Sequence, residues 1–204
     1  MGAIGFVRHG ESEWNRLGRV QGSLDIPLSQ TGRAQAKTFA VAVRQRNIGQ
    51  ICTSPLQRAK ETALIIAKVL ESGGIVPHRH EMDELRERHY GHYQGCYLFR
   101  LRAERQLVDA EHLIVGGAVE PWRQLERRVC HAAGLLCERA AGNEDILAVV
   151  HGGWMKALRT LINRRVDGRN MDNLECIWVD SSDLAHLCCD AQKALLNREG
   201  EFGC

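Results

Sequence analysis

The sequence predicts an α/β fold, a three-layer α/β/α sandwich with a mostly parallel central sheet. Apolar runs at 4–7 and 146–150 each end in polar residues and glycine, as buried parallel strands do where they reach a site. The segments after them carry apolar residues at helical spacing, which is typical of helices that cover a sheet. With 204 residues, 44% of them hydrophobic, the chain has enough apolar side chains for one core. We therefore expect residues 1–204 to form a single domain.

A loop, a helix and a strand are expected after the first strand. Glycine and proline interrupt any periodicity over 21–28, which indicates the loop. Thr31 is placed to cap the helix. The apolar residues of this helix recur at helical spacing: Ala36, Phe39, Ala40 and Val43. The apolar run at 51–53 is the next expected strand.

Another helix should begin directly after that strand, with Ser54 as its N-cap and Pro55 at its first position. Arg58 then lies in the first turn or so, away from the apolar stripe. A helix start favours anions through its free N–H groups and its dipole, and an arginine there strengthens a phosphate site. The glycines at 73 and 74 end the helix, and 75–78 is an expected edge strand because of its proline.

The middle of the chain is less regular. Residues 83–95 are dense in charge and poor in apolar periodicity, which is typical of a loop. Residues 96–119 show only a weak helical pattern, and we interpret this stretch as a lid-like insertion over the pocket. A clearer helix is expected to start at 120–122, with its apolar face at Leu125, Val129, Ala132 and Leu136.

The last elements are the strand at 146–150, a helix over 154–162 and two short apolar runs. These runs, 175–179 and 184–188, flank a polar turn and predict a hairpin at the sheet edge.

Composition excludes several classes of protein. The formal charge is +2, so the chain as a whole does not demand nucleic acid or an anionic membrane. The sequence contains no long apolar segment and no secretory signal pattern, which indicates a cytoplasmic protein. The eight cysteines have no Cys-x-x-Cys spacing and are expected to be reduced. Glycine patterns for nucleotide-driven kinases and for dehydrogenases are absent from the sequence as well.

Four cationic or potentially cationic side chains are predicted to meet at one edge of the sheet. Arg8 and His9 end the first strand, His151 ends the strand at 146–150, and Arg58 follows a third strand. Two guanidiniums offer forked donors that suit phosphoryl oxygens, and they keep their charge at neutral pH. A dianionic phosphate is the expected guest.

The motif at residues 8–15, Arg-His-Gly-Glu-Ser-Glu-Trp-Asn, resembles that of the histidine phosphatase superfamily, the phosphoglycerate mutase-like proteins. Residues 53–59 and 87–91 resemble two further segments of that family. The resemblance implies a phosphoglycerate mutase-like fold with His9 as a nucleophile that becomes a phosphohistidine. It also implies that Glu87 is the proton donor and acceptor and that His151 stabilises the transition state beside Arg8 and Arg58.

Other positions are carried over from the same resemblance. Asn15, Gln21 and Gly22 are expected near the phosphate or its ester, and Gly152 beside His151. The turn at 116–121 departs from the family's Gly-Gly-Glu-Ser pattern, since two residues separate the glycines from Glu120 and Pro121 stands where serine is usual.

The resemblance leaves three functions open. We expect a metal-independent phosphomonoester hydrolase that acts on a small phosphorylated metabolite and needs no cofactor. A cofactor-dependent phosphoglycerate mutase is the first alternative. The short connection from Gly95 to Glu120 argues against it, because mutases carry a long basic insertion there. A non-catalytic phospho-ligand binding protein is the second alternative.

A metal site between residues 78 and 92 is a less favoured interpretation. The histidines at 78, 80, 89 and 92, with Asp83 or Glu84, do not have the spacing of a known metal-ligand pattern. The sequence does not reveal the oligomeric state.

Overall fold

The computed structural model describes residues 2–103, 118–140, 142–162 and 172–189. Within these residues one five-stranded sheet has the order β3-β2-β4-β1-β5. Four strands are parallel: β1 (Ala3–Arg8), β2 (Ile48–Thr53), β3 (His78–Glu81) and β4 (Asp145–Val150). The fifth, β5 (Cys176–Asp180), runs antiparallel to β1 at the edge. The mostly parallel sheet is the predicted one.

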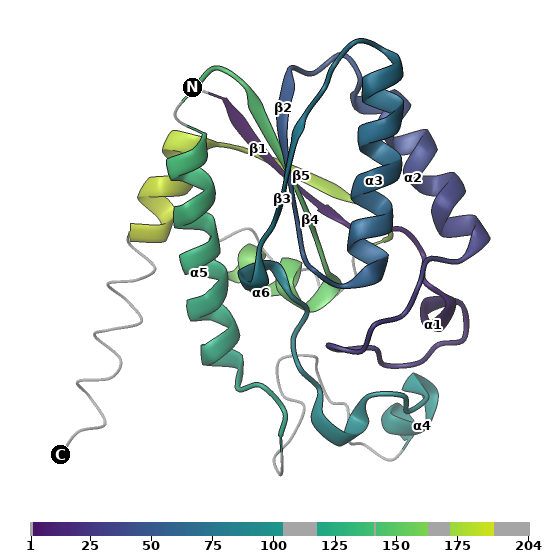
Figure 1. The fold of residues 1–204 in the computed structure, drawn as a ribbon. Coiled ribbons are helices and arrows are strands. Elements are labelled where there is room, and N and C mark those ends of the chain that lie inside the picture. The colour runs from purple at the N-terminus through teal and green to yellow at the C-terminus, as the bar shows by residue number, and fades with distance from the viewer. Residues whose placement is uncertain (1, 104–117, 141, 163–171, 190–204) are drawn as a thin grey trace, which may run out of the picture.

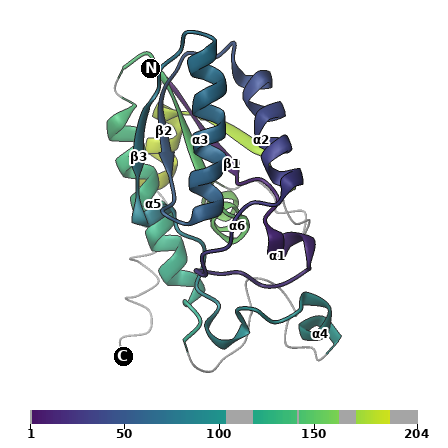
Figure 2. The same ribbon diagram turned by 45° about the vertical axis from the view of Figure 1, so that its right-hand side comes forward.

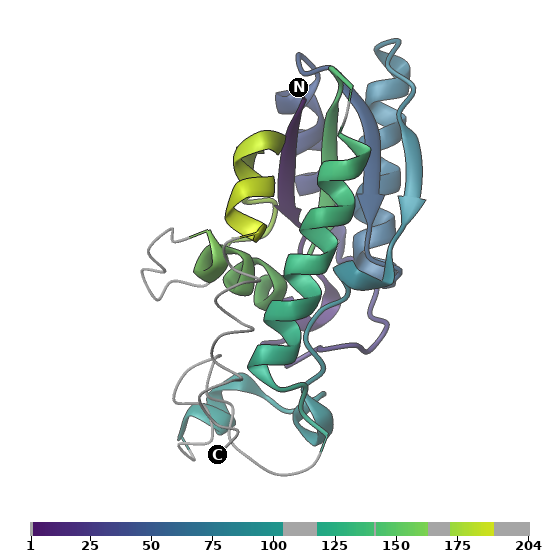
Figure 3. The ribbon, with the colours of Figure 1, turned by 90° about the vertical axis from the view of Figure 1, so that its left-hand side faces the viewer.

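Helices cover both faces of the sheet (Figure 1). On one face, α2 (Gln30–Val43) and α3 (Gln57–Ser72) pack on Val7, Leu147 and Val149. On the other face, α5 (Trp122–Arg139) and α6 (Gly152–Leu161) pack on Phe6 and Ala148. Figure 3 views the sheet from the α5 side. Alternate strand residues therefore feed two apolar cores, and the predicted three-layer sandwich is confirmed.

The start of α2 differs from the prediction by two residues. Ser29, and not Thr31, is the N-cap, and its Oγ accepts a hydrogen bond from Gly32 N at 3.0 Å. Either hydroxyl is a competent cap by residue type, so the choice depends on where the preceding loop turns.

The start of α3 also lies later than predicted. Ser54 and Pro55 precede the helix, whose N-cap is Leu56, and Ser54 Oγ accepts the N–H of Leu56 at 3.2 Å. Ser54 thus caps a turn rather than the helix. The edge strand is β3, which begins at His78 where the predicted strand 75–78 ends.

The predicted hairpin at 175–179 and 184–188 is wrong. Only β5 is a strand, and residues 181–189 are helical. Leu184 and Cys188, four positions apart, are buried with β5 residues in the core, whereas His186 between them is exposed. A strand would place all three on one face, so burial selects the helix.

Short elements lie beyond the carboxyl ends of the parallel strands (Figure 2). They are α1 (Glu13–Arg16), the 3₁₀ turns η1 (Asp83–Leu85) and η2 (Gly91–Tyr93), and α4 (Leu98–Ala103). The turns interrupt the predicted loop at 83–95, and α4 begins the predicted lid, most of which lies outside the described residues. None of the described helices is long and apolar enough to cross a membrane. The seven cysteines in the described ranges are free thiols.

Candidate active site

Neighbouring strands bring the two predicted histidines together. β1 pairs with β4 so that Arg8 lies opposite Val150, and His9 N donates to Val150 O at 3.0 Å. His9 and His151 therefore leave adjacent strands at the same edge, with their ring centroids 5.1 Å apart. Both side chains are buried, with 2% and 0% exposure.

Hydrogen bonds define the tautomer of His9. Its Nδ1 lies 2.6 Å from Gly10 O, which only accepts, so Nδ1 carries the proton. Its Nε2 lies 3.2 Å from Arg58 Nε, which only donates, so Nε2 carries a lone pair. Burial, followed by the charges of Arg58 and Arg8, lowers the pKa of His9 well below its usual value. His9 is therefore a neutral imidazole with Nε2 available to attack.

Arg58 is buried, with 1% exposure, although the sequence placed it away from the apolar stripe. Its Nη1 donates to Leu24 O at 2.8 Å and its Nη2 to Gly22 O at 2.7 Å. These carbonyls and His9 accept hydrogen bonds from the guanidinium. Apolar side chains could not do so. Burial lowers the pKa of Arg58 to about 10, so the group stays charged at neutral pH.

His151 is the side chain that most clearly indicates a ligand-binding site. Within the described residues neither of its ring nitrogens has a hydrogen-bond partner, although both are buried. Burial, followed by the charge of Arg58, lowers its pKa well below the usual value. Buried polar groups are almost always hydrogen-bonded, so a ligand with oxygens is the expected missing partner.

Arg8 supplies the second guanidinium. Burial lowers its pKa, and the charges of Glu87 and Asp172 oppose that shift. The guanidinium lies beside Gly152, where an added Cβ would stand 3.6 Å from Arg8 Cζ. Arg8 thus lies against the first turn of α6, next to His151.

Glu87 lies at the N-terminus of α6. Its Oε2 accepts from Gly153 N at 3.0 Å, and its Oε1 accepts from Trp154 N at 3.1 Å and Arg88 N at 2.8 Å. These contacts hold the carboxyl group against the first turn of α6, whose N-cap is His151. The charge of Glu87 also acts on Arg8 and Arg58, so Glu87 lies near both arginines.

The four other predicted residues occupy different positions. Gly22, with a φ of +57°, presents its carbonyl to Arg58, and Gly152 begins α6 beside Arg8. Gln21 accepts from Ser12 Oγ at 2.7 Å. Asn15 belongs to the capping box of α1, where its side chain accepts from Ser12 N. Asn15 and Gln21 thus share the neighbour Ser12, and their expected place near the phosphate or its ester stays a prediction.

Two residues near this cluster were missed. Asn173 Nδ2 donates to His9 O at 2.9 Å, and nothing in the sequence around it signals this contact. Tyr90 lies in the motif at 87–91, and its hydroxyl stands 2.8 Å from where a Cβ on Gly153 would be. Burial, reinforced by the charge of Glu87, raises the pKa of Tyr90, so its hydroxyl stays protonated.

The minor metal reading has no support in the described ranges. No group of three or more His, Cys, Asp or Glu side chains there could hold a metal ion. His78 and His80 lie on β3, whereas His89 Nδ1 contacts Ala118 O at 2.6 Å.

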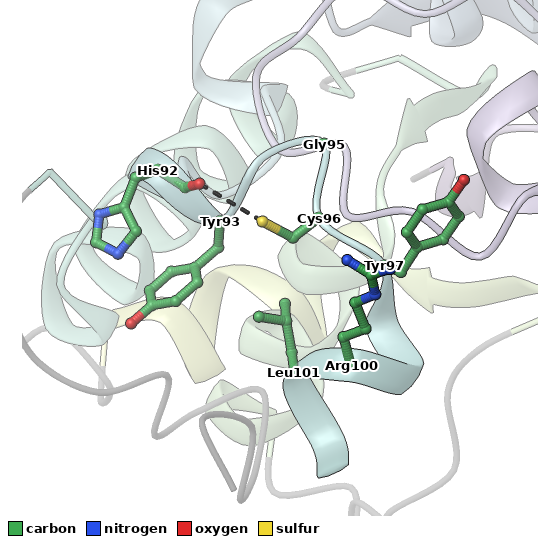
Figure 4. A pocket seen from close by; sticks show the side chains of 7 residues that line it. All are labelled: His92, Tyr93, Gly95, Cys96, Tyr97, Arg100 and Leu101. Carbon is green, nitrogen blue, oxygen red and sulfur yellow. Dashed lines mark hydrogen bonds between the residues drawn. The ribbon is translucent and has the colours of Figure 1, made fainter. Parts of the chain in front are cut away.

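A separate pocket of about 480 Å³ lies between residues 92 and 101, where the lid-like segment begins (Figure 4). Its lining residues are His92, Tyr93, Gly95, Cys96, Tyr97, Arg100 and Leu101. The chain that forms it also holds the loop at the site, because Gly95 N donates to Val20 O and Gln94 Oε1 accepts from Ser23 N. The pocket contains none of the nine predicted site residues.

Comparison with known proteins places the chain in a family. Residues 4–198 match the model of the histidine phosphatase superfamily, branch 1. A metal-independent phosphoserine phosphatase from Arabidopsis thaliana is 31% identical over 202 residues, which cover 90% of this chain and 82% of the relative. A probable phosphoglycerate mutase from Yersinia enterocolitica is 31% identical over 208 residues, which cover 89% of this chain and 93% of the relative.

A solved structure agrees with these relatives. Phosphoserine phosphatase from Entamoeba histolytica, in complex with 3-phosphoglyceric acid, aligns with a TM-score of 0.71 at 25% identity. The alignment covers 87% of this chain and 90% of that chain. The relatives support a phosphatase activity for this chain. The resemblance seen in the motifs is confirmed: the chain belongs to the histidine phosphatase superfamily, branch 1.

Proposed function

We propose that this phosphatase hydrolyses small phosphate monoesters through a phosphohistidine formed at His9 Nε2. The observation that carries the proposal is the tautomer of His9. Gly10 O holds the proton on Nδ1, which leaves a neutral nucleophilic nitrogen inside a cationic, buried pocket.

In the first step, the Nε2 lone pair attacks phosphorus while the bond from phosphorus to the ester oxygen breaks. The leaving oxygen needs a proton, and a protonated Glu87 carboxyl supplies it. Negative charge on the equatorial oxygens is met by Arg8, Arg58 and His151. For this to occur, the Arg58 N–H that contacts Nε2 turns to a phosphoryl oxygen.

In the second step, water attacks the phosphorus of the phosphohistidine. The Glu87 carboxylate takes a proton from that water, and the bond from phosphorus to nitrogen breaks. Inorganic phosphate leaves, Glu87 is protonated again, and Nε2 recovers its lone pair. The same residues thus complete the cycle without a metal or a cofactor.

The substrate class follows from the relatives. One relative is a phosphoserine phosphatase, and a solved neighbour binds 3-phosphoglyceric acid, so we propose a small phosphorylated carboxylic acid as substrate. Phosphoglycerate mutase is the second candidate, since one relative is named as a probable mutase. The short connection from Gly95 to Glu120 favours hydrolysis, because less chain is available to exclude water from the intermediate.

The proposal extends to the whole chain. Residues 1–204 form one domain with 96–119 as its lid, which the family match over 4–198 and the position of α4 beyond the strand ends support. The partner is a small-molecule phosphate ester, with no role for nucleic acid or a membrane, and the location is cytoplasmic.

The test is phosphate release from p-nitrophenyl phosphate, phosphoserine and 3-phosphoglycerate by the wild type and by His9→Ala. Hydrolysis that is lost in His9→Ala supports the proposal. Transfer of phosphate to 3-phosphoglycerate in the presence of 2,3-bisphosphoglycerate, without net hydrolysis, would favour the mutase. Binding of phosphate esters without turnover of any of them would favour a binding protein.

A further inference from the structure

The segment that carries Glu87 is held on both sides by an ion pair between α5 and the residue just before its N-cap. Glu120 and Arg128 form this pair, with Arg128 Nε and Nη2 donating to Glu120 Oε1 at 3.0 and 2.9 Å. Nη2 also donates to Oε2 at 2.8 Å. Both side chains are largely covered, with 22% and 10% exposure for Arg128 and Glu120. We call these two residues the clamp.

Arg128 holds the chain just before Glu87. Its Nη1 donates to Glu84 O at 3.0 Å and to Arg86 O at 2.6 Å. Together with the bonds to Glu120, these contacts engage all three nitrogens of the guanidinium. A lysine has three donors on one nitrogen and cannot span the carboxylate and both carbonyls.

Glu120 holds the chain just after Glu87. Its Oε2 accepts from His89 N at 3.2 Å, its own N–H donates to His89 O at 2.8 Å, and its O accepts from Arg88 Nε at 2.9 Å. The backbone is therefore fixed at positions 84, 86 and 89, on either side of the carboxylate.

The position of Glu87 depends on this backbone path. The three bonds that its carboxylate accepts come from the backbone N–H groups of Arg88, Gly153 and Trp154. Trp154 also donates from Nε1 to Glu84 O at 2.9 Å, so α6 and the clamp meet on the same carbonyl. A shift of the 84–89 backbone would move the carboxylate relative to α6 and to His9.

We propose that Glu120 and Arg128 are positioning residues that place Glu87 for proton transfer to the leaving oxygen. The proposal rests on the proposed function, in which Glu87 is the acid. It also assigns a role to Glu120, a largely covered carboxylate outside the five proposed catalytic residues. The Glu120 carboxylate is hydrogen-bonded to Arg128 and His89. It therefore supports Glu87, which is the acid.

The experiment compares turnover of p-nitrophenyl phosphate with that of an alkyl phosphate such as glycerol phosphate. An alkoxide needs protonation far more than p-nitrophenolate does. The ratio of the two kcat/KM values therefore reports proton transfer to the leaving group, because kcat/KM excludes the later hydrolysis step that both esters share. Arg128→Met should lower kcat/KM for the alkyl ester by on the order of 10- to 100-fold more than for the nitrophenyl ester, since a misplacement of about 1 Å costs about 100-fold. Arg128→Lys should recover part of the ratio.

Arg46→Met is the matched control. Arg46 bonds to Asp145 at 2.7 Å and stacks 3.6 Å above the Trp178 ring, in an ion pair on residues outside the proposed active site. It should lower stability without changing the ratio of the two kcat/KM values. In a Glu87→Gln background, Arg128→Met should leave the ratio unchanged, because the group it positions is gone.

The outcomes separate the two proposals. If Glu87→Gln slows the alkyl ester selectively but Arg128→Met slows both esters equally, the positioning role is overturned and the proposed function stands. If Glu87→Gln itself lowers kcat/KM equally for both esters, the acid role fails and the positioning role fails with it. Should Arg128→Met not fold, Arg128→Lys and Glu120→Gln apply the same comparison with smaller changes.

Discussion

Gly153→Ala should disable proton transfer without adding or removing a charged group. A Cβ at this position would lie 2.6 Å from Glu87 Oε1 and 2.8 Å from Tyr90 Oη. Ordinary contacts begin near 3.4 Å, so the carboxylate oxygen must retreat by about 0.8 Å. The helix itself tolerates the change, because alanine is favoured over glycine within a helix by about 1 kcal/mol.

The expected cost is worked from that displacement. A misplacement of about 1 Å at a reacting group costs on the order of 100-fold in rate. We expect kcat/KM for an alkyl phosphate to fall by about this factor. The value for the nitrophenyl ester should fall much less, because its leaving group needs little protonation.

The assay is steady-state turnover of both esters, with thermal unfolding measured in parallel. Gly134→Ala in α5 is the control, since nothing lies within 4 Å of the Cβ it adds. It should leave both rates unchanged and stability equal or slightly higher. Gly153→Ala with wild-type rates on the alkyl ester would refute the placement of Glu87 against α6.

Three further predictions concern the cationic pocket. Arg58→Met should slow both esters by about 100- to 1000-fold and weaken inhibition by phosphate, and slowing of the alkyl ester alone would contradict this. Extended chelation should leave the rate unchanged, whereas a large loss restored by a divalent ion would contradict metal independence. Burial lowers the pKa of His9 and His151, so the unfolded chain binds these protons first as pH falls below 6.5. The free energy of unfolding should therefore fall from about pH 7.5 to about pH 5.5, with a smaller fall in His151→Gln; equal slopes would contradict the burial argument.

Sequence rules were sufficient for the two parallel strands that carry the histidines. His9 and His151 each follow an apolar run, and parallel pairing of β1 with β4 brings their ends together. The apolar runs and the polar residues that end them are local features of the sequence. The sheet and the histidine pair could therefore be predicted.

Contacts distant in sequence account for what was missed. The burial of Arg58 depends on the carbonyls of Gly22 and Leu24, 36 and 34 positions away, which helix periodicity does not contain. Asn173 reaches His9 across 164 positions, and Arg128 reaches Arg86 across 42. Each of these polar side chains bonds to a backbone carbonyl. Residue types do not indicate which carbonyl will accept such a bond.

The fold places the site residues, whereas their chemical roles also depend on which groups carry protons. The predicted residues Arg8, His9, Arg58, Glu87 and His151 lie together, and their proposed roles depend on protonation states that the contacts imply. His9 is the residue for which both ring nitrogens have a partner that fixes the tautomer. The nucleophile is therefore the role most open to direct measurement.

That measurement is capture of the intermediate in the wild type and in His9→Ala. Protein mixed with p-nitrophenyl phosphate is quenched in alkali within the first turnovers, because phosphohistidine survives base and is lost in acid. Phosphorus NMR and peptide mass spectrometry then locate the phosphate. The account predicts one phosphate on Nε2 of His9 and none in His9→Ala, which should have lost turnover. An acid-stable adduct, phosphate on His151, or a His9→Ala protein with full activity would contradict it.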